Sequence, residues 1–278
     1  MEVVKTKFEL QQCLSGKGKN MSVGFVPTMG ALHKGHLSLV DIASKENDIV
    51  VVSIFVNPTQ FNDKNDLDRY PKDLNSDLAL LKTVNCDVVF SPEVDEMYPD
   101  KDDRIFNFGQ LEKVREGKHR PGHFNGVAQI VSKLFDAVKP DKAYFGLKDF
   151  QQLAIIKALV KILNFDVDIV PCPIIREYDG LAMSSRNRQL TIEQRNESAL
   201  ISQTLIKARN LIHHKSVKEL TEWVIKGINK SDMLDVEYFE IVDDENLLPV
   251  NNWDEPTVKV GCVAVYCGGI RLIDNIVF

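Results

Sequence analysis

The sequence predicts an α/β fold, a doubly wound parallel sheet followed by a second, smaller α+β domain at the C-terminus. Short apolar segments alternate with helix-like segments over roughly the first two-thirds of the chain, as in strands and helices wound into a parallel sheet. One segment is apolar on both faces, which a central parallel strand requires. The alternation stops near residue 174. We therefore expect a Rossmann-like domain over residues 1–174 and a smaller domain over residues 175–278.

Five strands are expected in the first domain. The first, at residues 23–26, should end at Pro27, because proline has no N–H to donate to a neighbouring strand. The second, at residues 49–56, is the segment with two apolar faces. The others are shorter apolar segments at residues 87–90, 143–145 and 167–170.

Helical patterns separate these strands, at residues 36–46, 74–83, 127–138 and 150–163. The third is the most regular, because its apolar residues recur at the spacing of one helix face. These residues are Val127, Ile130, Val131, Leu134 and Val138.

The second domain is expected to open with a long helix, because Thr191 and Gln194 have the spacing of a capping box. That helix should run toward His213 and His214, whose imidazoles would complement the helix dipole. A second helix at residues 217–228 and three strands should follow. The strands are expected at residues 236–242, 258–266 and 269–275.

Composition bounds the function. The chain has 34 basic and 40 acidic residues and a net charge of −6, which argues against a nucleic-acid partner. No apolar segment approaches the ~20 residues that cross a bilayer, and the first residues lack the core of a signal peptide. The five scattered cysteines predict reduced thiols and no structural zinc. We therefore expect a cytoplasmic protein with neither membrane nor nucleic acid as partner.

Polar clusters follow four of the predicted strands. Because ligands of parallel sheets bind beyond the carboxyl ends of the strands, we expect these clusters to share one rim. They occupy residues 27–36, 57–61, 146–152 and 175–187.

The first cluster contains His33-Lys34-Gly35-His36 where a strand gives way to a helix. The helix N-terminus offers N–H groups and positive potential to a phosphate, and Gly35 permits close approach. By itself, such a pair of histidines is as often structural or metal-linked as catalytic. Zinc is the weaker alternative, because no third ligand stands at a recognisable spacing.

This element resembles the HxGH signature of the HIGH-type nucleotidyltransferases, and Met183-Ser184-Ser185-Arg186 resembles their second, KMSKS-like signature. The wider clusters resemble the pantothenate synthetase family specifically. The stretches that carry this resemblance, in chain order, are residues 27–33, 57–61, 123–127, 148–152, 176–187 and 271–275.

The resemblance implies an enzyme, an AMP-forming ligase that condenses (R)-pantoate with β-alanine through a pantoyl adenylate. ATP is the co-substrate, Mg²⁺ the cofactor, and AMP and pyrophosphate the by-products. It also implies a homodimer. No enzyme nucleophile is needed, which agrees with the absence of glycines flanking Ser184-Ser185 in a G-x-S-x-G elbow.

The resemblance assigns catalysis to His33, His36, Lys148 and Arg186, with His36 as the proton donor. Pantoate is assigned to Gln60, Gln152 and Asn57, and β-alanine to Gln60. Residues for Mg²⁺ stay unassigned. The implied ATP-binding set is Met29, Gly30, Ala31, Leu32, His33, Lys34, Gly35, His36, Gly146, Leu147, Lys148, Asp149, Ile175, Met183, Ser184, Ser185 and Arg186.

Structural interpretations compete at several positions. Lys148 and Asp149 could form an ion pair at a helix start, and Gln151 is expected at the surface. His119 and His123 are expected to be loop residues. The acidic stretches at residues 63–73 and 95–103 are expected to be solvated loops, although one of their aspartates could hold Mg²⁺ through water.

Two other functions are compatible with the two signatures. A related adenylyltransferase acting on a phosphate would need an additional cation where Gln60 and Gln152 stand. A nucleotide-binding sensor would bind ATP without turnover, and intact His36, Lys148 and Arg186 count against it. A tRNA synthetase fragment would need an anticodon-binding region, which the sequence lacks.

Overall fold

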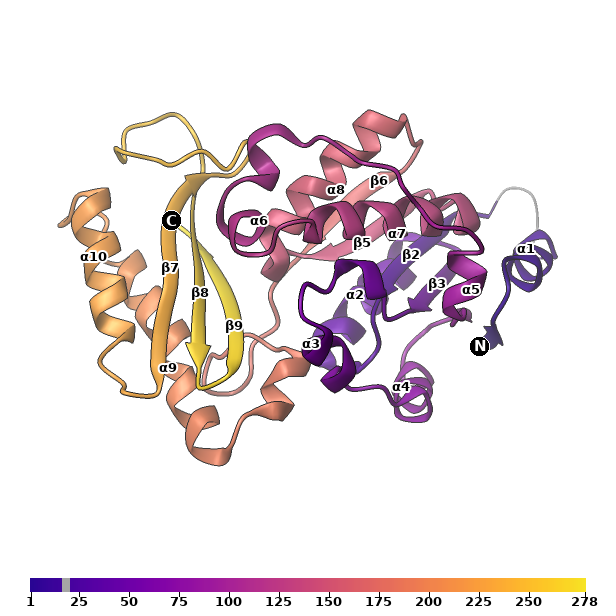
Figure 1. The fold of residues 1–278 in the computed structure, drawn as a ribbon, viewed down its shortest axis with the longest axis horizontal. Coiled ribbons are helices and arrows are strands. Elements are labelled where there is room, and N and C mark those ends of the chain that lie inside the picture. Colours follow the sequence, from indigo (N-terminus) through magenta and orange to yellow (C-terminus); the bar gives the residue numbers. More distant parts are fainter. Residues whose placement is uncertain (17–20) are drawn as a thin grey trace. The chain divides into compact units, whose positions relative to one another are not determined.

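A computed structural model describes residues 1–16 and 21–278 (Figure 1). Their contacts divide the chain into two compact units. Unit 1 consists of residues 1–147 and 152–172, and unit 2 of residues 148–151 and 173–278. The division lies close to the predicted boundary at residue 174, but residues 148–151 group with unit 2. That the two units are separate domains remains a prediction.

Unit 1 contains a parallel sheet of six strands in the order β1-β4-β3-β2-β5-β6. The predicted central strand is β3, whose six residues are all buried. The five predicted strands are present, and the structure adds β1, which was not predicted. The strands are β1 (Glu2–Val4), β2 (Val23–Thr28), β3 (Ile49–Ile54), β4 (Val88–Phe90), β5 (Lys142–Gly146) and β6 (Asp168–Cys172).

The prediction that Pro27 ends its strand is wrong, because β2 continues to Thr28. Pro27 pairs with Ser53 of β3, whereas the pairing of β2 with β5 ends at Phe25. The missing N–H therefore falls beyond the β5 ladder, where no bond depends on it.

Helices cover both faces of this sheet, as the doubly wound prediction requires (Figure 1). The predicted helices correspond to α2, α4, α7 and α8, of which α2 and α7 begin earlier than expected. The helical segments of unit 1, together with η3 and α8, which each have residues in both units, are α1 (Lys7–Ser15), α2 (Lys34–Glu46), η1 (Pro58–Gln60), α3 (Lys64–Arg69), α4 (Leu74–Leu81), α5 (Val94–Met97), η2 (Gly109–Glu112), α6 (Arg115–His119), α7 (His123–Val138), η3 (Leu147–Asp149) and α8 (Phe150–Leu163).

Alternate strand residues enter two separate apolar clusters. Phe25, Val88 and Phe90 pack with α7 and α8 on one face of the sheet. Their neighbours Val26 and Val89 pack with α2 and α4 on the other. The period of two in a strand thus divides one apolar run between two cores.

Unit 2 contains an antiparallel sheet in the order β7-β8-β9 and two longer helices. The capping box is confirmed, with Thr191 and Gln194 each accepting from the other's backbone N–H. The helix ends at Arg209, so His213 and His214 lie beyond it and Lys207 and Arg209 are the cations of its last turn. The elements are η4 (Ser185–Gln189), α9 (Ile192–Arg209), α10 (Val217–Ile228), β7 (Leu234–Asp243), β8 (Lys259–Cys267) and β9 (Ile270–Val277).

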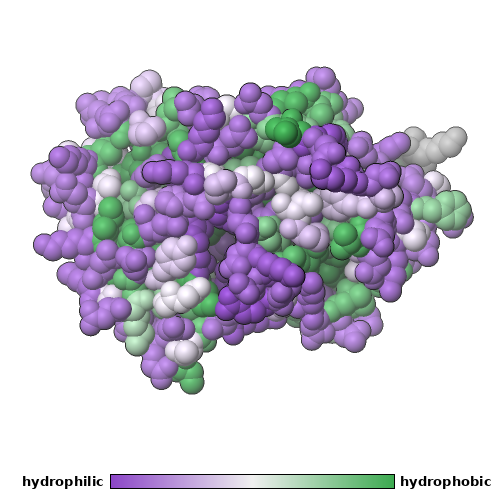
Figure 2. All heavy atoms as spheres, in the orientation of Figure 1, coloured by the Kyte–Doolittle hydropathy of each residue, from purple (hydrophilic) through white to green (hydrophobic). Residues whose placement is uncertain are grey.

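Hydrophilic side chains cover most of the face seen in Figure 2, with apolar ones scattered among them. Within residues 1–16 and 21–278, no helix is both long and apolar enough to cross a membrane.

Candidate active site

The loop that follows β2 turns sharply before the histidine motif. Its first bonds come from Thr28, whose hydroxyl donates to Ser53 O at 2.7 Å and accepts from Gly30 N–H at 3.2 Å. Gly30 has φ of 78° and Ala31 has φ of 50°. A Cβ on Gly30 would lie 2.8 Å from an oxygen of Asp77, so the loop needs glycine for both conformation and space.

The carboxylate of Asp77, on α4, holds this loop from within. It accepts from the backbone N–H of Ala31 at 3.0 Å and of Leu32 at 2.7 Å, and its residue is 2% exposed. Sequence reasoning missed Asp77. The available signal was an acidic residue facing inward on a helix whose other inward residues are apolar.

The histidine motif is a capping box for α2. His33 is the N-cap, and its Nδ1 accepts from Gly35 N–H at 3.1 Å. His36 reaches back, and its Nδ1 accepts from His33 N–H at 3.3 Å. The two rings lie 4.1 Å apart between centroids. Histidines thus replace the Ser/Thr and Glu/Gln that usually fill these positions.

This capping fixes the chemistry of both rings. A neutral imidazole whose Nδ1 accepts a hydrogen bond carries its proton on Nε2. Both histidines therefore hold an Nε2–H donor at the positive end of a helix of 13 residues. The first turn of α2 contains no acidic residue. The arrangement suits a phosphate or another anion.

A second polar group forms where η1 meets α7. Asn57 and Gln60 are 1% and 8% exposed. The Asn57 Nδ2 donates to Gly126 O at 3.0 Å and to Gln60 Oε1 at 3.1 Å, and Gln60 Nε2 donates to the Met29 sulfur at 3.0 Å. The structure therefore joins the predicted residues Met29, Asn57 and Gln60 into one chain of contacts.

His123 is not the loop residue that we expected. It is the first residue of α7, is 6% exposed, and its Nδ1 lies 2.8 Å from Gln60 O. Arg120 Nη1 contacts its other ring nitrogen at 3.1 Å. Gly126 sits one turn further, and a Cβ there would lie 2.5 Å from Thr59 O. The helix backbone therefore packs directly on η1. His119 is the last residue of α6.

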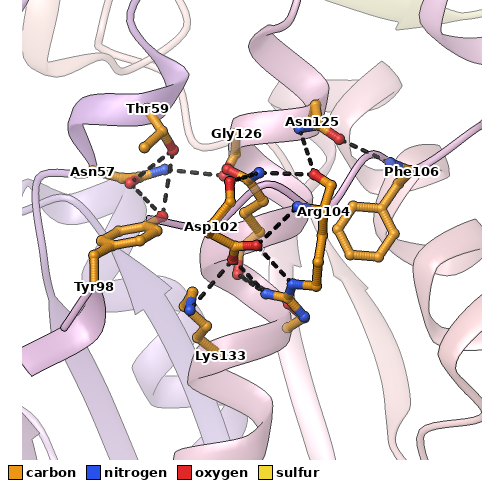
Figure 3. Close-up of polar contacts among 11 residues, drawn as sticks. Asn57, Thr59, Tyr98, Asp102, Arg104, Phe106, Asn125, Gly126 and Lys133 are labelled. Carbon is orange, nitrogen blue, oxygen red and sulfur yellow. Dashed lines mark hydrogen bonds and ion pairs between the residues drawn. The ribbon is translucent and has the colours of Figure 1, made fainter. Parts of the chain in front are cut away.

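The acidic stretches are not merely solvated loops. Asp63 and Asp73 cap the N-termini of α3 and α4. The side chain of Asp102 is 5% exposed and accepts from Arg104 Nε at 2.9 Å and Nη2 at 2.7 Å, with Lys133 Nζ at 3.3 Å (Figure 3). These hydrogen bonds hold the pKa of Asp102 well below its usual range, so this carboxylate is ionised.

The two neighbouring glutamines at the start of α8 differ from expectation in one respect. Gln151, expected at the surface, is 5% exposed, whereas Gln152 is half-buried. Adjacent helix residues point in different directions, and here the first of the two points inward. That Gln152 binds a substrate remains a prediction.

In unit 2, residues 175–183 form a tight hairpin. Met183 N–H donates to Ile175 O at 3.0 Å, which brings together two residues of the implied ATP-binding set. Gly180 turns the hairpin with φ of 95°. Arg176 fastens it to β9, donating to Asp274 at 2.7 and 3.0 Å. Burial raises the pKa of Asp274, and the facing guanidinium opposes that shift.

The second signature continues from this hairpin into η4. Ser184 is its N-cap and accepts from Arg186 N–H at 3.3 Å. Asn187 ties the turn back to the hairpin, donating to Glu177 Oε1 at 3.0 Å. Arg195 pairs with Asp179 at 2.6 Å and lowers the pKa of that carboxyl. Arg186 is thus carried on a turn that polar contacts hold at both ends.

Lys148 lies in η3 with its backbone carbonyl bonded to Asn275 Nδ2 at 3.0 Å. Its Nζ is 3.8 Å from Asp149 Oδ2, so the ion pair of the competing structural interpretation exists, although it is long and Asp149 is half-exposed. Such a pair is weak enough to leave the ammonium available to a stronger anion.

Three similarities with known proteins fit these motifs. Residues 2–277 match the family described as Pantoate-beta-alanine ligase. The chain is 54% identical over 277 residues to a "Pantothenate synthetase" of Bacteroides fragilis, covering 99% of this chain and 98% of that protein. A relative of that name from Porphyromonas gingivalis is 51% identical over 277 residues, covering 99% of each chain.

Solved structures of proteins with these names are also similar to the chain. The pantothenate synthetase of Thermus thermophilus is 42% identical and superposes with a TM-score of 0.93, with 99% of each chain covered. A pantoate-beta-alanine ligase of Francisella tularensis, complexed with beta-gamma ATP and beta-alanine, is 37% identical with a TM-score of 0.80, covering 99% of this chain and 97% of that one.

Proposed function

Because the chain belongs to the pantoate-beta-alanine ligase family, we propose that it condenses (R)-pantoate with β-alanine at the expense of ATP. The pantoate carboxylate attacks the α-phosphorus and pyrophosphate leaves, giving pantoyl adenylate. The β-alanine amine then attacks the acyl carbon, forming the amide of pantothenate, and AMP leaves. The observation that carries the proposal is the similarity, over nearly the whole chain, to proteins named pantothenate synthetase.

The histidine motif supports the first step. The Nε2–H donors of His33 and His36 and the N-terminus of α2 suit the oxygens of the α- and β-phosphates. Charge moves toward the pyrophosphate as the P–O bond breaks, and donors placed there in advance stabilise that transition state. We assign the proton-donor role to His36.

Two cations of unit 2 are also proposed to act on the phosphates. Lys148 contributes a compact charge to the phosphates, and Arg186 offers a planar fork of donors to the leaving pyrophosphate. Ile175 and Met183 are apolar neighbours suited to adenine. The remaining predicted ATP-binding residues belong to the same loops and are proposed on the family resemblance.

Gln60 and Gln152 suit pantoate, because a neutral amide can bond a carboxylate and hydroxyls alike. Gln60 is also proposed to contact β-alanine. The two donor and two acceptor positions of the Asn57 amide all bond to protein groups. We therefore propose that Asn57 orients Gln60 and does not bind pantoate directly.

Mg²⁺ is proposed as the cofactor. No three metal-binding side chains come together anywhere in residues 1–16 or 21–278, which fits an ion that takes most of its ligands from ATP phosphates and water. When bound, it would neutralise phosphate charge. A homodimer is proposed on the family resemblance alone, and a cytoplasmic location on the five scattered cysteines.

Isotope transfer tests the proposal. Pantoate labelled with ¹⁸O in its carboxylate should pass one labelled oxygen to AMP in the presence of ATP, Mg²⁺ and β-alanine. Without β-alanine, about one pyrophosphate should form per active site if the adenylate stays bound. Label in inorganic phosphate together with ADP would overturn the adenylate route. Unlabelled AMP formed without pantoate would indicate ATP hydrolysis, and ATP binding without turnover would indicate a sensor.

A further inference from the structure

Which end of the Gln60 amide faces a ligand is decided by the groups behind it. Gly126 O is a backbone carbonyl and can only accept, so the Asn57 atom 3.0 Å away is its NH₂ group. That same NH₂ lies 3.1 Å from one end of the Gln60 amide, which must then be the oxygen. The Gln60 NH₂ group points the other way, toward Met29.

Hydroxyl groups hold the other side of Asn57. Tyr98 OH donates to Asn57 Oδ1 at 2.8 Å, and Thr59 Oγ1 donates to the same oxygen at 3.2 Å (Figure 3). Tyr98 makes the shorter bond. Burial raises the pKa of Tyr98, so its hydroxyl keeps its proton near neutral pH.

The ring of Tyr98 is itself clamped. Lys133 Nζ lies 5.0 Å from the ring centroid and 3.3 Å from the Asp102 carboxylate, a geometry that favours a cation against the ring face. The Phe55 ring packs beside it at 6.4 Å between centroids. The hydroxyl is therefore presented to Asn57 from a fixed position.

We propose that Tyr98 is a positioning residue: it holds Asn57 in the orientation that Gly126 O requires, so that Gln60 presents an N–H donor and the site selects a substrate with an acceptor oxygen. The identity of that substrate rests on the proposed function, in which the acceptor oxygen belongs to pantoate. In the structure the Gln60 NH₂ contacts a thioether, which is a weak acceptor. A carboxylate or hydroxyl oxygen is a stronger partner for it.

The test is Tyr98→Phe, which keeps the ring and removes only the hydroxyl. The KM for pantoate should rise about three- to tenfold, the range expected for one lost hydrogen bond. The KM for ATP and kcat should stay within about twofold of the parent values. Adding Thr59→Val removes the second donor to Asn57 and should raise the pantoate KM further, to at least about tenfold.

Tyr144→Phe is the matched control. Tyr144 is buried, and its hydroxyl also bonds an asparagine amide, Asn47, at 2.6 Å. Tyr144 packs in the apolar cluster with α2 and α4, whereas Asn57 and Gln60 bond to the α7 side. This variant loses the same chemical group and should leave the KM for pantoate unchanged.

Side-chain amide resonances provide a readout that needs no turnover. Gln60→Glu removes the Gln60 NH₂ signal and so identifies it. That signal should shift in Tyr98→Phe and stay in place in Tyr144→Phe. If the parent protein makes no pantothenate, the proposed function fails, and these shifts still test the Tyr98–Asn57–Gln60 chain.

Three results would overturn the inference. The first is an unchanged pantoate KM in the double variant. The second is an equal rise in the KM values for pantoate and ATP, which indicates general loosening. The third is a Gln60 signal that does not respond to loss of the Tyr98 hydroxyl.

Discussion

At the scale of single residues, the two histidines combine structure and chemistry. Serine and glutamate would cap α2 equally well, but they would leave no N–H beyond the cap. Imidazole has two nitrogens, and here one closes the helix while the other keeps its proton. The structural and catalytic interpretations of His33 and His36 are therefore compatible, and a suitable substitution can separate them.

His33→Ser is that substitution. Serine at the N-cap still accepts the capping hydrogen bond, so the free energy of unfolding should change by less than about 0.5 kcal/mol. The Nε2–H donor is lost, and the rate of adenylate formation should fall about 10²- to 10³-fold, as when one transition-state donor is removed. Denaturant unfolding and pyrophosphate release measure the two effects. A large loss of stability with little loss of rate would make the histidine purely structural.

Arg186→Lys tests the shape of the cation in the second signature. Lysine keeps the charge but not the planar fork. We expect adenylation to slow by more than about tenfold, or about 1.4 kcal/mol, with ATP affinity changing less. Pyrophosphate release in a single turnover and equilibrium ATP binding provide the comparison. Arg188→Lys, two residues along and exposed, is the control. Adenylation at the parent rate would remove Arg186 from the transition state.

At the scale of elements, the site in unit 1 depends on segments brought up against α7. The backbone of η1 packs against the helix at Gly126. The segment that carries Asp102 and Arg104 accepts hydrogen bonds from Gln129 of the helix. Asp102 also pairs with Lys133 of the helix (Figure 3). These contacts are polar and at least partly buried, so each partner is costly to remove. Helix α7 therefore positions the residues that orient Gln60.

The Asp102 contacts predict a pH-dependent stability. The folded-state pKa of Asp102 is lowered by its hydrogen bonds to Arg104, so its contribution is complete above the unfolded pKa of about 3.9 and is lost as pH falls through the lower folded value. Asp102→Asn should cost about 1–3 kcal/mol at about pH 7. The difference from the parent should shrink between about pH 4 and pH 2 in urea titrations.

Asp103→Asn is the control for this prediction. The Asp103 side chain is 74% exposed, and its removal should leave the urea midpoint unchanged at every pH. A difference between the parent and Asp102→Asn that stayed constant down to about pH 2 would contradict the assignment of the pH dependence to Asp102.

At the scale of the whole molecule, residues assigned to ATP come from both units. The chain passes from unit 1 to unit 2 and back at residues 148–151, and it enters unit 2 again at residue 173. Two crossings place Lys148 and the hairpin of residues 175–183 in one compact unit.

Ligand binding at this scale is measurable as thermal stabilisation. A ligand at about 100 times its Kd stabilises the folded state by about 2.7 kcal/mol, so MgATP should raise Tm. Lys148→Ala should weaken that response. Lys101→Ala, whose parent side chain is 85% exposed, should keep it. An equal rise of Tm in both variants would exclude Lys148 from ATP binding.

The sequence by itself determined the fold class, most strands and helices, and the two signatures. These features are local: apolar periodicity, capping residues and motif spacing all lie within a few neighbouring positions. The capping box at Thr191, the helix at residues 217–228 and the strands of unit 2 follow from such patterns.

Only the tertiary structure decided the partners of buried polar groups. Asp77, Tyr98 and His123 act on residues distant in sequence, and Asp102 lies in a stretch whose composition indicates a solvated loop. A hydrogen bond between distant segments leaves no periodic trace, because it depends on which surfaces the packing brings together. The orientation of the Gln60 amide could not be predicted for the same reason. It depends on the carbonyl of Gly126 on α7, which lies far from Gln60 in the sequence.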